Sequence, residues 1–370
     1  MKGLRLVLFA VVLLFGGSVV AQDALPAREA LDEGWNVIEP GGDTICARGL
    51  PYAFYAREGS SDNLLIEFEG GGACWTGVTC GAVPTFTEAV GIQTAEDLEA
   101  FSMGIHDFEN PENPFADYDM VYLPYCTGDV HMGNSVANYS VGGIDYEIHH
   151  NGYTNASTAL AWAYENFDAP ESVFVTGCSA GALGSSFHAP NIMAQYDDVR
   201  VTQFGDSGGG YRGDLSSQFS RWGTADVLPD LPEFDGLTAA DLSFNLFYLA
   251  AGARFPDHLL SQFNTAHDEA QQFFVSLSVN ALPYEEALAA NIGELETNLD
   301  NFRSFTAGGT QHCVLPFDEF YTYQVDGVRV RDWVADLAAG EPIENIACTG
   351  CETAELAPAA EATEAADYGR

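Results

Sequence analysis

Short hydrophobic runs alternate with longer amphipathic segments along most of the chain. Runs rich in β-branched and aromatic residues predict strands at 52–55, 63–68, 119–125, 172–176, 199–204, 258–265 and 302–305. Residues 153–167 instead repeat apolar side chains at helical spacing, with Thr154 or Asn155 as a cap and Pro170 just beyond the end. Strands that alternate with helices indicate a mostly parallel sheet covered by helices. We therefore expect an α/β fold, with a polar turn at 59–62 joining the first two strands.

The two ends of the chain differ from its middle. Residues 1–21 combine a charged start, a short apolar run and a small-residue cleavage site after about Ala21, which is typical of a signal peptide. Residues 352–370 are mostly Ala, Glu, Thr and Pro, and we expect a disordered acidic tail there. The remainder, 22–351, is expected to be one secreted domain, extracellular or periplasmic. An aromatic-rich segment at about 216–256 and a second segment at about 281–301 are expected to form cap-like helical insertions.

The charge balance restricts the partners. The chain of 370 residues has 13 Lys and Arg against 54 Asp and Glu, a formal net charge of −41. Such a field repels nucleic acids and anionic membranes, so we expect neither as a partner, and it disfavours a polyanionic substrate. Hydration of an acidic surface in saline surroundings is the simplest explanation of this charge.

Eight cysteines in an exported chain predict disulfides. Cys74 and Cys80 are close enough in sequence to close one loop, and Cys46 could be bonded to Cys126. Cys178 is expected to be a buried free thiol. The last three cysteines cluster near the end, and zinc is the weaker alternative for Cys348–Cys351. We expect no metal and no cofactor.

The segment at 172–187 carries the strongest chemical signal. A predicted strand runs into Gly-x-Ser-x-Gly at 177–181, and a helix can follow it. This arrangement holds a serine at the tip of a strained turn, so Ser179 is predicted to be a nucleophile. Gly205–Gly209 also matches the pattern and spells the signature of trypsin-like peptidases. Three consecutive glycines at 208–210 are a poor helix start, so Ser207 is the weaker candidate, and its segment is expected to line the pocket.

Three glycines at 70–72 directly follow the strand at 63–68. Such a loop lets backbone N–H groups approach a ligand oxygen, as in the oxyanion loops of esterases. A nucleophilic serine also needs a base and an orienting carboxylate, and Asp268 and His312 each follow a predicted strand. Asp257 is the alternative acid, but it precedes its strand. His131, His149 and His150 are more simply explained as structural or solvated residues.

Five ordered motifs, found from about Cys46 to Cys313, resemble the pectin acetylesterase and Notum family in its bacterial form. They are Glu-Gly-Gly-Gly-Ala-Cys-Trp at 69–75, Pro-Tyr-Cys-Thr-Gly-Asp at 124–129, Gly-Cys-Ser-Ala-Gly at 177–181, Ala-His-Asp-Glu-Ala-Gln at 266–271 and Gly-Thr-Gln-His-Cys at 309–313.

The resemblance implies an α/β-hydrolase fold and ester hydrolysis by Ser179, Asp268 and His312. It also implies an oxyanion hole formed by the backbone amides of Gly71, Gly72 and Ala180. Trp75 departs from the plant and animal pattern, because two residues separate it from the glycines. The acidity of the chain disfavours pectin, which is itself a polyanion.

These observations favour a secreted serine carboxylesterase that removes acetyl or other acyl groups from a small-molecule or polysaccharide ester. Two alternatives are open at this point. The first is a hydrolase-fold binding protein with weak or no activity, against which an intact set of catalytic residues argues. The second, less favoured, is a serine peptidase.

Overall fold

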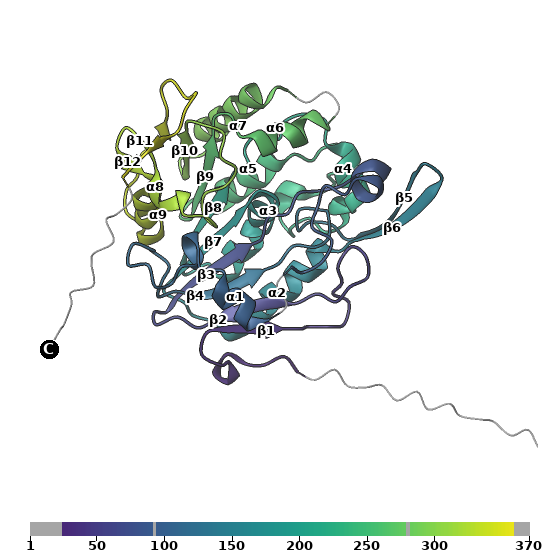
Figure 1. The fold of residues 1–370 in the computed structure, drawn as a ribbon, viewed down its shortest axis with the longest axis horizontal. Helices are drawn as coiled ribbons and strands as arrows, with labels where there is room; N and C mark the ends of the chain where they lie inside the picture. The colour runs from purple at the N-terminus through teal and green to yellow at the C-terminus, as the bar shows by residue number, and fades with distance from the viewer. Residues whose placement is uncertain (1–23, 92–93, 279–281, 359–370) are drawn as a thin grey trace, which may run out of the picture.

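A central, mostly parallel sheet organises the molecule (Figure 1). The structure is a computed structural model and describes residues 24–91, 94–278 and 282–358. Within these residues nine strands form one sheet, in the order β1 (Trp35–Ile38), β2 (Phe54–Arg57), β4 (Asp119–Leu123), β3 (Asn63–Phe68), β7 (Ser172–Cys178), β8 (Arg200–Asp206), β9 (Leu259–Thr265), β10 (Phe302–Ala307) and β13 (Ile346–Ala347). All neighbours from β4 to β13 pair in parallel, whereas β1 and β2 are antiparallel additions at one edge.

Helices pack against this sheet, as the alternating pattern predicted (Figure 1). In the described ranges they are α1 (Ala95–Ala100), α2 (Gly152–Asn166), α3 (Ala180–Gln195), α4 (Ser216–Trp222), α5 (Phe244–Arg254), α6 (Glu269–Ser276), α7 (Tyr284–Asn298), α8 (Glu319–Thr322) and α9 (Val330–Ala339). Single turns add η1 (Arg28–Ala30), η2 (Val78–Ala82), η3 (Gly104–His106), η4 (Thr224–Asp226) and η5 (Pro232–Phe234). The longest, α3, packs on β3, β7 and β8, so the segment after β7 crosses the middle of the sheet.

All seven predicted strands are present, one with the predicted bounds and six at slightly shifted bounds. The turn at 59–62 does not join neighbouring strands, because β4 lies between β2 and β3. A hairpin that the sequence analysis did not predict, β5 (Ser135–Val141) and β6 (Ile144–His150), extends away from the body (Figure 1). A small sheet of β12 (Val328–Arg329), β11 (Tyr323–Val325) and β14 (Glu355–Leu356) was also not predicted.

Two expectations about the domain need revision. The segments expected as cap-like insertions contain α5 and α7, which are the crossover helices from β8 to β9 and from β9 to β10. From these segments, Gln218 and Trp222 of α4 and Phe244 at the start of α5 line the apolar pocket described below. Within the tail expected to be disordered from Glu352, Glu355–Leu356 instead form β14, which pairs with β11. The expected signal peptide at 1–21 and residues 359–370 lie outside the described residues.

All eight cysteines are paired in the structure. The expected Cys46–Cys126 and Cys74–Cys80 bonds are present, and Cys348–Cys351 is a disulfide, which removes its thiols from any zinc site. The prediction of a free thiol at Cys178 was wrong, because Cys178 is bonded to Cys313. Local sequence patterns do not indicate this pair, because β8 and β9 lie between β7 and β10 in the sheet. The two cysteines come together only at the sheet edge, where the segments after these strands meet.

The parallel order of the sheet determines where chemistry can occur. Ser179 follows β7, Asp206 ends β8, Asp268 follows β9 and His312 follows β10, and these are four adjacent strands. Because parallel neighbours have their carboxyl ends at the same edge, the loops that carry these residues converge there.

No helix in the described ranges combines the length and apolar character needed to span a membrane.

Candidate active site

Ser179 lies at a sharp turn between β7 and α3. Its φ of 57° and ψ of −115° place a non-glycine residue in a region that L-residues rarely adopt. Its backbone N–H donates to the carbonyl oxygen of Asp206 at 2.8 Å, which fixes the turn against β8. The side chain is largely buried and reaches two adjoining cavities.

The glycines that flank Ser179 are required by close backbone contacts. A Cβ at Gly177 would meet the backbone of Gly181 at 2.5 Å, and a Cβ at Gly181 would overlap the carbonyl of Phe68. These contacts leave no room for a side chain at position 177 or 181. The structure therefore gives the physical reason for the Gly-x-Ser-x-Gly pattern at this turn.

His312 and Asp268 form a hydrogen-bonded pair near Ser179. The Nδ1–H of His312 donates to the carboxylate of Asp268, at 2.8 Å from Oδ2 and 3.0 Å from Oδ1. Asp268 is fully buried, whereas His312 is partly exposed and lines the same cleft as Ser179. Since a carboxylate only accepts hydrogen bonds, this contact places the proton of a neutral imidazole on Nδ1 and leaves Nε2 as the acceptor.

Gln271 supports this pair, and the sequence analysis did not identify its role. Asp268 is the N-cap of α6, and its Oδ1 accepts from the Gln271 N–H at 2.9 Å. The side-chain amide of Gln271 donates to Oδ2 at 2.9 Å, and its oxygen accepts from the Gly210 N–H at 2.8 Å. The spacing from Asp268 to Gln271 is that of a capping box, so the signal was present in the sequence.

The alternative acid and the other histidines lie elsewhere. Asp257 is exposed and precedes β9, so it lies at the opposite end of that strand from Asp268. His131 is buried and its Nε2–H donates to the Glu69 carbonyl at 2.8 Å. Burial lowers the pKa of His131 to about 3 and that of His150 to about 4, so both rings are neutral supports. His149 is half-buried and lies 3.7 Å from Glu147.

The glycine loop after β3 is held in an unusual backbone conformation. Gly71 has a φ of 146° and Gly72 a φ of 75°, and a Cβ on Gly72 would overlap the carbonyl of Thr85. The Thr87 N–H donates to the Gly71 carbonyl at 2.8 Å, and the Ala73 N–H donates to the Thr85 carbonyl at 3.2 Å. The N–H of Gly72 takes no part in these two bonds, and Gly72 lines both cavities beside Ser179.

Two cavities of different character meet at Ser179, Gly72 and Phe274. One is a narrow apolar pocket of about 40 Å³, whose walls include Leu183, Leu215 and Trp222. The other is an open cleft of about 510 Å³ that contains His312. Glu67 and Glu69 also line the cleft, and burial raises the pKa of Glu69 to about 7. Ser179 is therefore placed between a small apolar site and a larger polar one.

Asp206 and Ser207 have a role that the sequence analysis did not predict. Neither lines the two cavities, contrary to the expectation for this segment. One carboxylate oxygen of Asp206 accepts from the N–H groups of Val314 and Leu315, each at 2.8 Å. Ser207 Oγ accepts from the Cys313 N–H at 2.9 Å. These buried side chains therefore fix the loop that carries His312.

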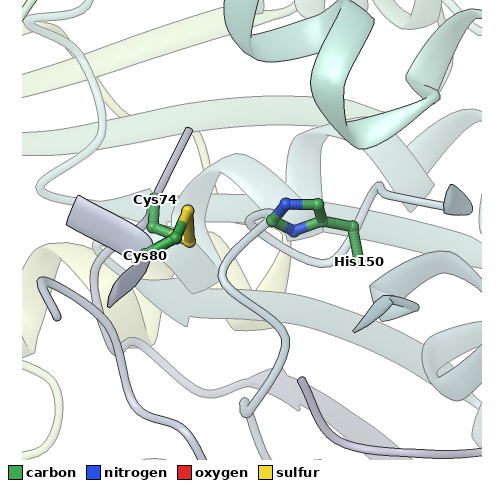
Figure 2. Close-up of side chains that lie close together, drawn as sticks. All are labelled: Cys74, Cys80 and His150. Atoms are coloured by element: carbon green, nitrogen blue, oxygen red, sulfur yellow. A yellow bond between two sulfur atoms is a disulfide. The ribbon is translucent and has the colours of Figure 1, made fainter. Parts of the chain in front are cut away.

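Among the residues that the structure describes, two groups of cysteine and histidine side chains lie close enough together to suggest a metal site. Figure 2 shows one of them, in which the His150 ring lies beside Cys74 and Cys80. The two sulfurs are bonded to each other. His150 Nε2 is 2.8 Å from the Tyr139 hydroxyl, and Nδ1 is 3.0 Å from the Thr127 carbonyl. In the other group His312 lies beside the Cys178–Cys313 disulfide. In neither group are the thiolates that bind zinc available.

Comparison with known proteins supports an ester hydrolase. A family model described as pectinacetylesterase matches residues 35–211. Among solved structures, the chain is similar to the Wnt deacylase Notum from Drosophila, with a TM-score of 0.59 and 17% sequence identity, over 84% of this chain and 95% of that one. No curated protein matches the chain significantly. The resemblance to the pectin acetylesterase and Notum family that the motifs indicated is therefore confirmed, as is the α/β-hydrolase fold.

Proposed function

We propose that this chain is a secreted serine carboxylesterase in which Ser179, His312 and Asp268 form the catalytic triad. The observation that carries the proposal is the 2.8 Å contact between His312 Nδ1 and Asp268, on a histidine that lines the same cleft as Ser179. In this arrangement the Nε2 of His312 takes the proton of the serine hydroxyl as Ser179 attacks the ester carbonyl. The buried carboxylate of Asp268 stabilises the imidazolium that forms.

The backbone amides of Gly71, Gly72 and Ala180 are the proposed oxyanion hole. Ala180 is the first residue of α3, so its N–H has no acceptor within the helix. The Gly72 N–H is not used by the bonds that hold its loop. Donors that are already oriented stabilise charge as it develops on the carbonyl oxygen, which is the largest single contribution in acyl transfer.

The two cavities suggest which part of the ester binds where. A cavity needs ~10–15 Å³ to hold one water, so the apolar pocket of about 40 Å³ has room for only a few heavy atoms. We assign it to a short acyl group such as acetyl. The cleft of about 510 Å³ suits the larger alcohol, for which a carbohydrate is the favoured class.

Charge favours a neutral alcohol over an anionic one. The cleft is lined by Glu67 and Glu69, and no Lys or Arg is among its lining residues within the described ranges. A polyanion such as pectin would approach these carboxylates in a chain of net charge −41. The proposed substrate is therefore an acetylated neutral carbohydrate or a similar small ester. Four disulfides fit the proposed export, since such bonds persist in oxidising compartments.

A chain-length series with Ser179→Ala tests this function. We expect kcat/KM on p-nitrophenyl esters to be highest for acetate to butyrate and to fall at least about tenfold by octanoate, because extra methylenes overfill the pocket. Ser179→Ala should fold and lose at least about 10³-fold in kcat. A variant that kept more than a small fraction of wild-type turnover would exclude Ser179 as the nucleophile. It would also reopen the alternatives of a weak binding protein and a peptidase.

A further inference from the structure

One disulfide connects the sequence neighbours of Ser179 and His312, the two residues that the proposed function places at the reacting atoms. Cys178 directly precedes Ser179 and Cys313 directly follows His312, although 135 residues separate the two cysteines in sequence. Each sulfur is thus one residue away from the proposed nucleophile or base. In the described residues, the other three disulfides join segments that carry neither Ser179 nor His312.

The backbone on both sides of this bond is held in an unfavourable conformation. Ser179 has a φ of 57° and Cys313 a φ of 61°, which are uncommon for residues with a side chain. Such conformations persist only where surrounding contacts impose them. Two hydrogen bonds supply such contacts: the Ser179 N–H donates to the backbone carbonyl of Asp206, and the Cys313 N–H donates to the side-chain hydroxyl of Ser207.

These hydrogen bonds hold each segment to the end of β8, whereas the disulfide cross-links the two segments to each other. Gly70 packs closely against Cys178, because a Cβ at this position would lie 2.8 Å from the Cys178 carbonyl oxygen and 3.2 Å from its Sγ. Cys178 lines the open cleft and is half-buried, whereas Cys313 is fully buried. A small thiol that enters the cleft therefore meets the Cys178 sulfur first.

We propose that the Cys178–Cys313 disulfide is a positioning element for Ser179 and His312, and that its reduction by a small dithiol switches the enzyme off. The proposal rests on the function proposed above. A thiolate of the dithiol attacks Cys178 Sγ, the disulfide breaks, and Cys313 leaves as a thiolate that takes up a proton. The second thiol of the reagent then displaces Cys178 from the mixed disulfide. The protein gains two electrons and two protons, and the dithiol becomes a cyclic disulfide.

Loss of this bond should affect turnover more than substrate binding. Once the bond is open, Ser179 and Cys313 can relax toward ordinary backbone conformations, which moves the hydroxyl relative to the imidazole. A displacement of 1 Å at reacting groups costs about 10²-fold in rate. The walls of the apolar pocket come mainly from residues outside this bond, so KM should change little.

The matched test compares two disulfides that each close a long segment of the chain. Cys178→Ala/Cys313→Ala removes the proposed positioning bond, and Cys46→Ala/Cys126→Ala removes one that closes 80 residues instead of 135. Loop-closure entropy rises slowly with length, so both variants should lose similar stability. We expect at least about a tenfold loss of kcat with KM nearly unchanged for the first variant, and wild-type kcat for the second. A folded first variant with wild-type kcat would overturn the proposal.

Reduction of the wild-type protein keeps the test decisive if the first variant does not fold. Dithiothreitol is titrated in the presence of EDTA, because the Cys178 and Cys313 sulfurs and a His312 nitrogen lie within 4.8 Å of one another and could bind a metal once reduced. Loss of kcat should follow opening of the Cys178–Cys313 bond, measured by alkylation and mass spectrometry, while circular dichroism stays unchanged. Full activity after this bond has opened would overturn the proposal.

The two proposals fail in different ways. If Ser179→Ala keeps wild-type activity, the proposed function is wrong and the disulfide has no triad to position. If Ser179→Ala is inactive and the enzyme with the open disulfide stays fully active, only the positioning role is wrong.

Discussion

Replacing Asp268 by Asn tests the proposed catalytic arrangement most directly. The carboxylate accepts from His312 Nδ1–H, from the Gln271 N–H and from the Gln271 side-chain amide, and all three partners are donors. An Asn side chain has one oxygen and one NH₂ group, so one of these donors would face another donor. Asp268 is fully buried, so bulk solvent does not reach its side chain to relieve that conflict.

His312 is the partner that can adapt, because its ring can move its proton from Nδ1 to Nε2. Nδ1 would then accept from the Asn NH₂ group, and the Nε2 that should accept the serine proton would carry a hydrogen instead. In serine hydrolases the corresponding change lowers kcat by ~10⁴, which is about 5 kcal/mol of transition-state stabilisation. We expect a loss of this size for Asp268→Asn, with a loss of about 1–3 kcal/mol in folding stability.

The assay is kcat on p-nitrophenyl acetate, together with the melting temperature. Asp257→Asn is the matched control, because Asp257 is exposed at the other end of β9, and it should retain wild-type kcat. The reasoning is refuted if Asp268→Asn keeps kcat within about tenfold of wild type while folded, since the wrong tautomer cannot catalyse at that rate. A large loss in Asp257→Asn alone would move the acid to that residue.

Three further predictions concern the loop, the acid–base behaviour and the substrate charge. Gly72→Ala should lower kcat and the melting temperature, because its Cβ would overlap the Thr85 carbonyl and displace the proposed oxyanion donor; wild-type kinetics would contradict this. Burial raises the pKa of Glu69 from 4.5 to about 7, so protonation favours the folded state and the stability from this group is lost as pH rises from about 4.5 to 7. Glu69→Gln should flatten the dependence of unfolding free energy on pH in that window, as measured by urea denaturation, and an unchanged slope would refute the assignment. A neutral acetylated polysaccharide should be hydrolysed faster than an anionic one at low ionic strength, and salt should accelerate the anionic reaction; an anionic preference that weakens with salt would restore pectin.

Patterns within one element were predictable from the sequence, whereas contacts across the sheet were not. The strand at 63–68 was predicted to the residue, because it is a continuous buried run with a polar turn before it and glycines after it. Ser179, Asp268 and His312 could be proposed because each lies just after a strand. The order of the strands cannot be read from such local patterns, so the bond between Cys178 and Cys313 was missed.

Other omissions have identifiable physical reasons. The hairpin of β5 and β6 had a readable signal, because Gly142 and Gly143 both adopt a positive φ between two alternating segments. Asp206 and Ser207 belong to a glycine-rich stretch that resembles a peptidase signature. The sequence analysis therefore considered this stretch only as a catalytic motif or a pocket wall, and did not predict that the two side chains accept hydrogen bonds from the loop that carries His312. A motif carries little information about which backbone groups a buried side chain accepts from, because those partners lie about a hundred residues away.

The Cys178–Cys313 bond also sets when the enzyme can mature during synthesis. When Cys178 emerges from the ribosome its partner is still 135 residues away, which takes about 7–27 s to translate. Five cysteines are present until then, an odd number, and the first four form two native pairs among themselves. Any early pairing of Cys178 with one of those four is non-native and must be undone by thiol–disulfide exchange. Maturation of the active site therefore waits for the last third of the chain, and an oxidant that acts too early would trap the enzyme in an inactive form.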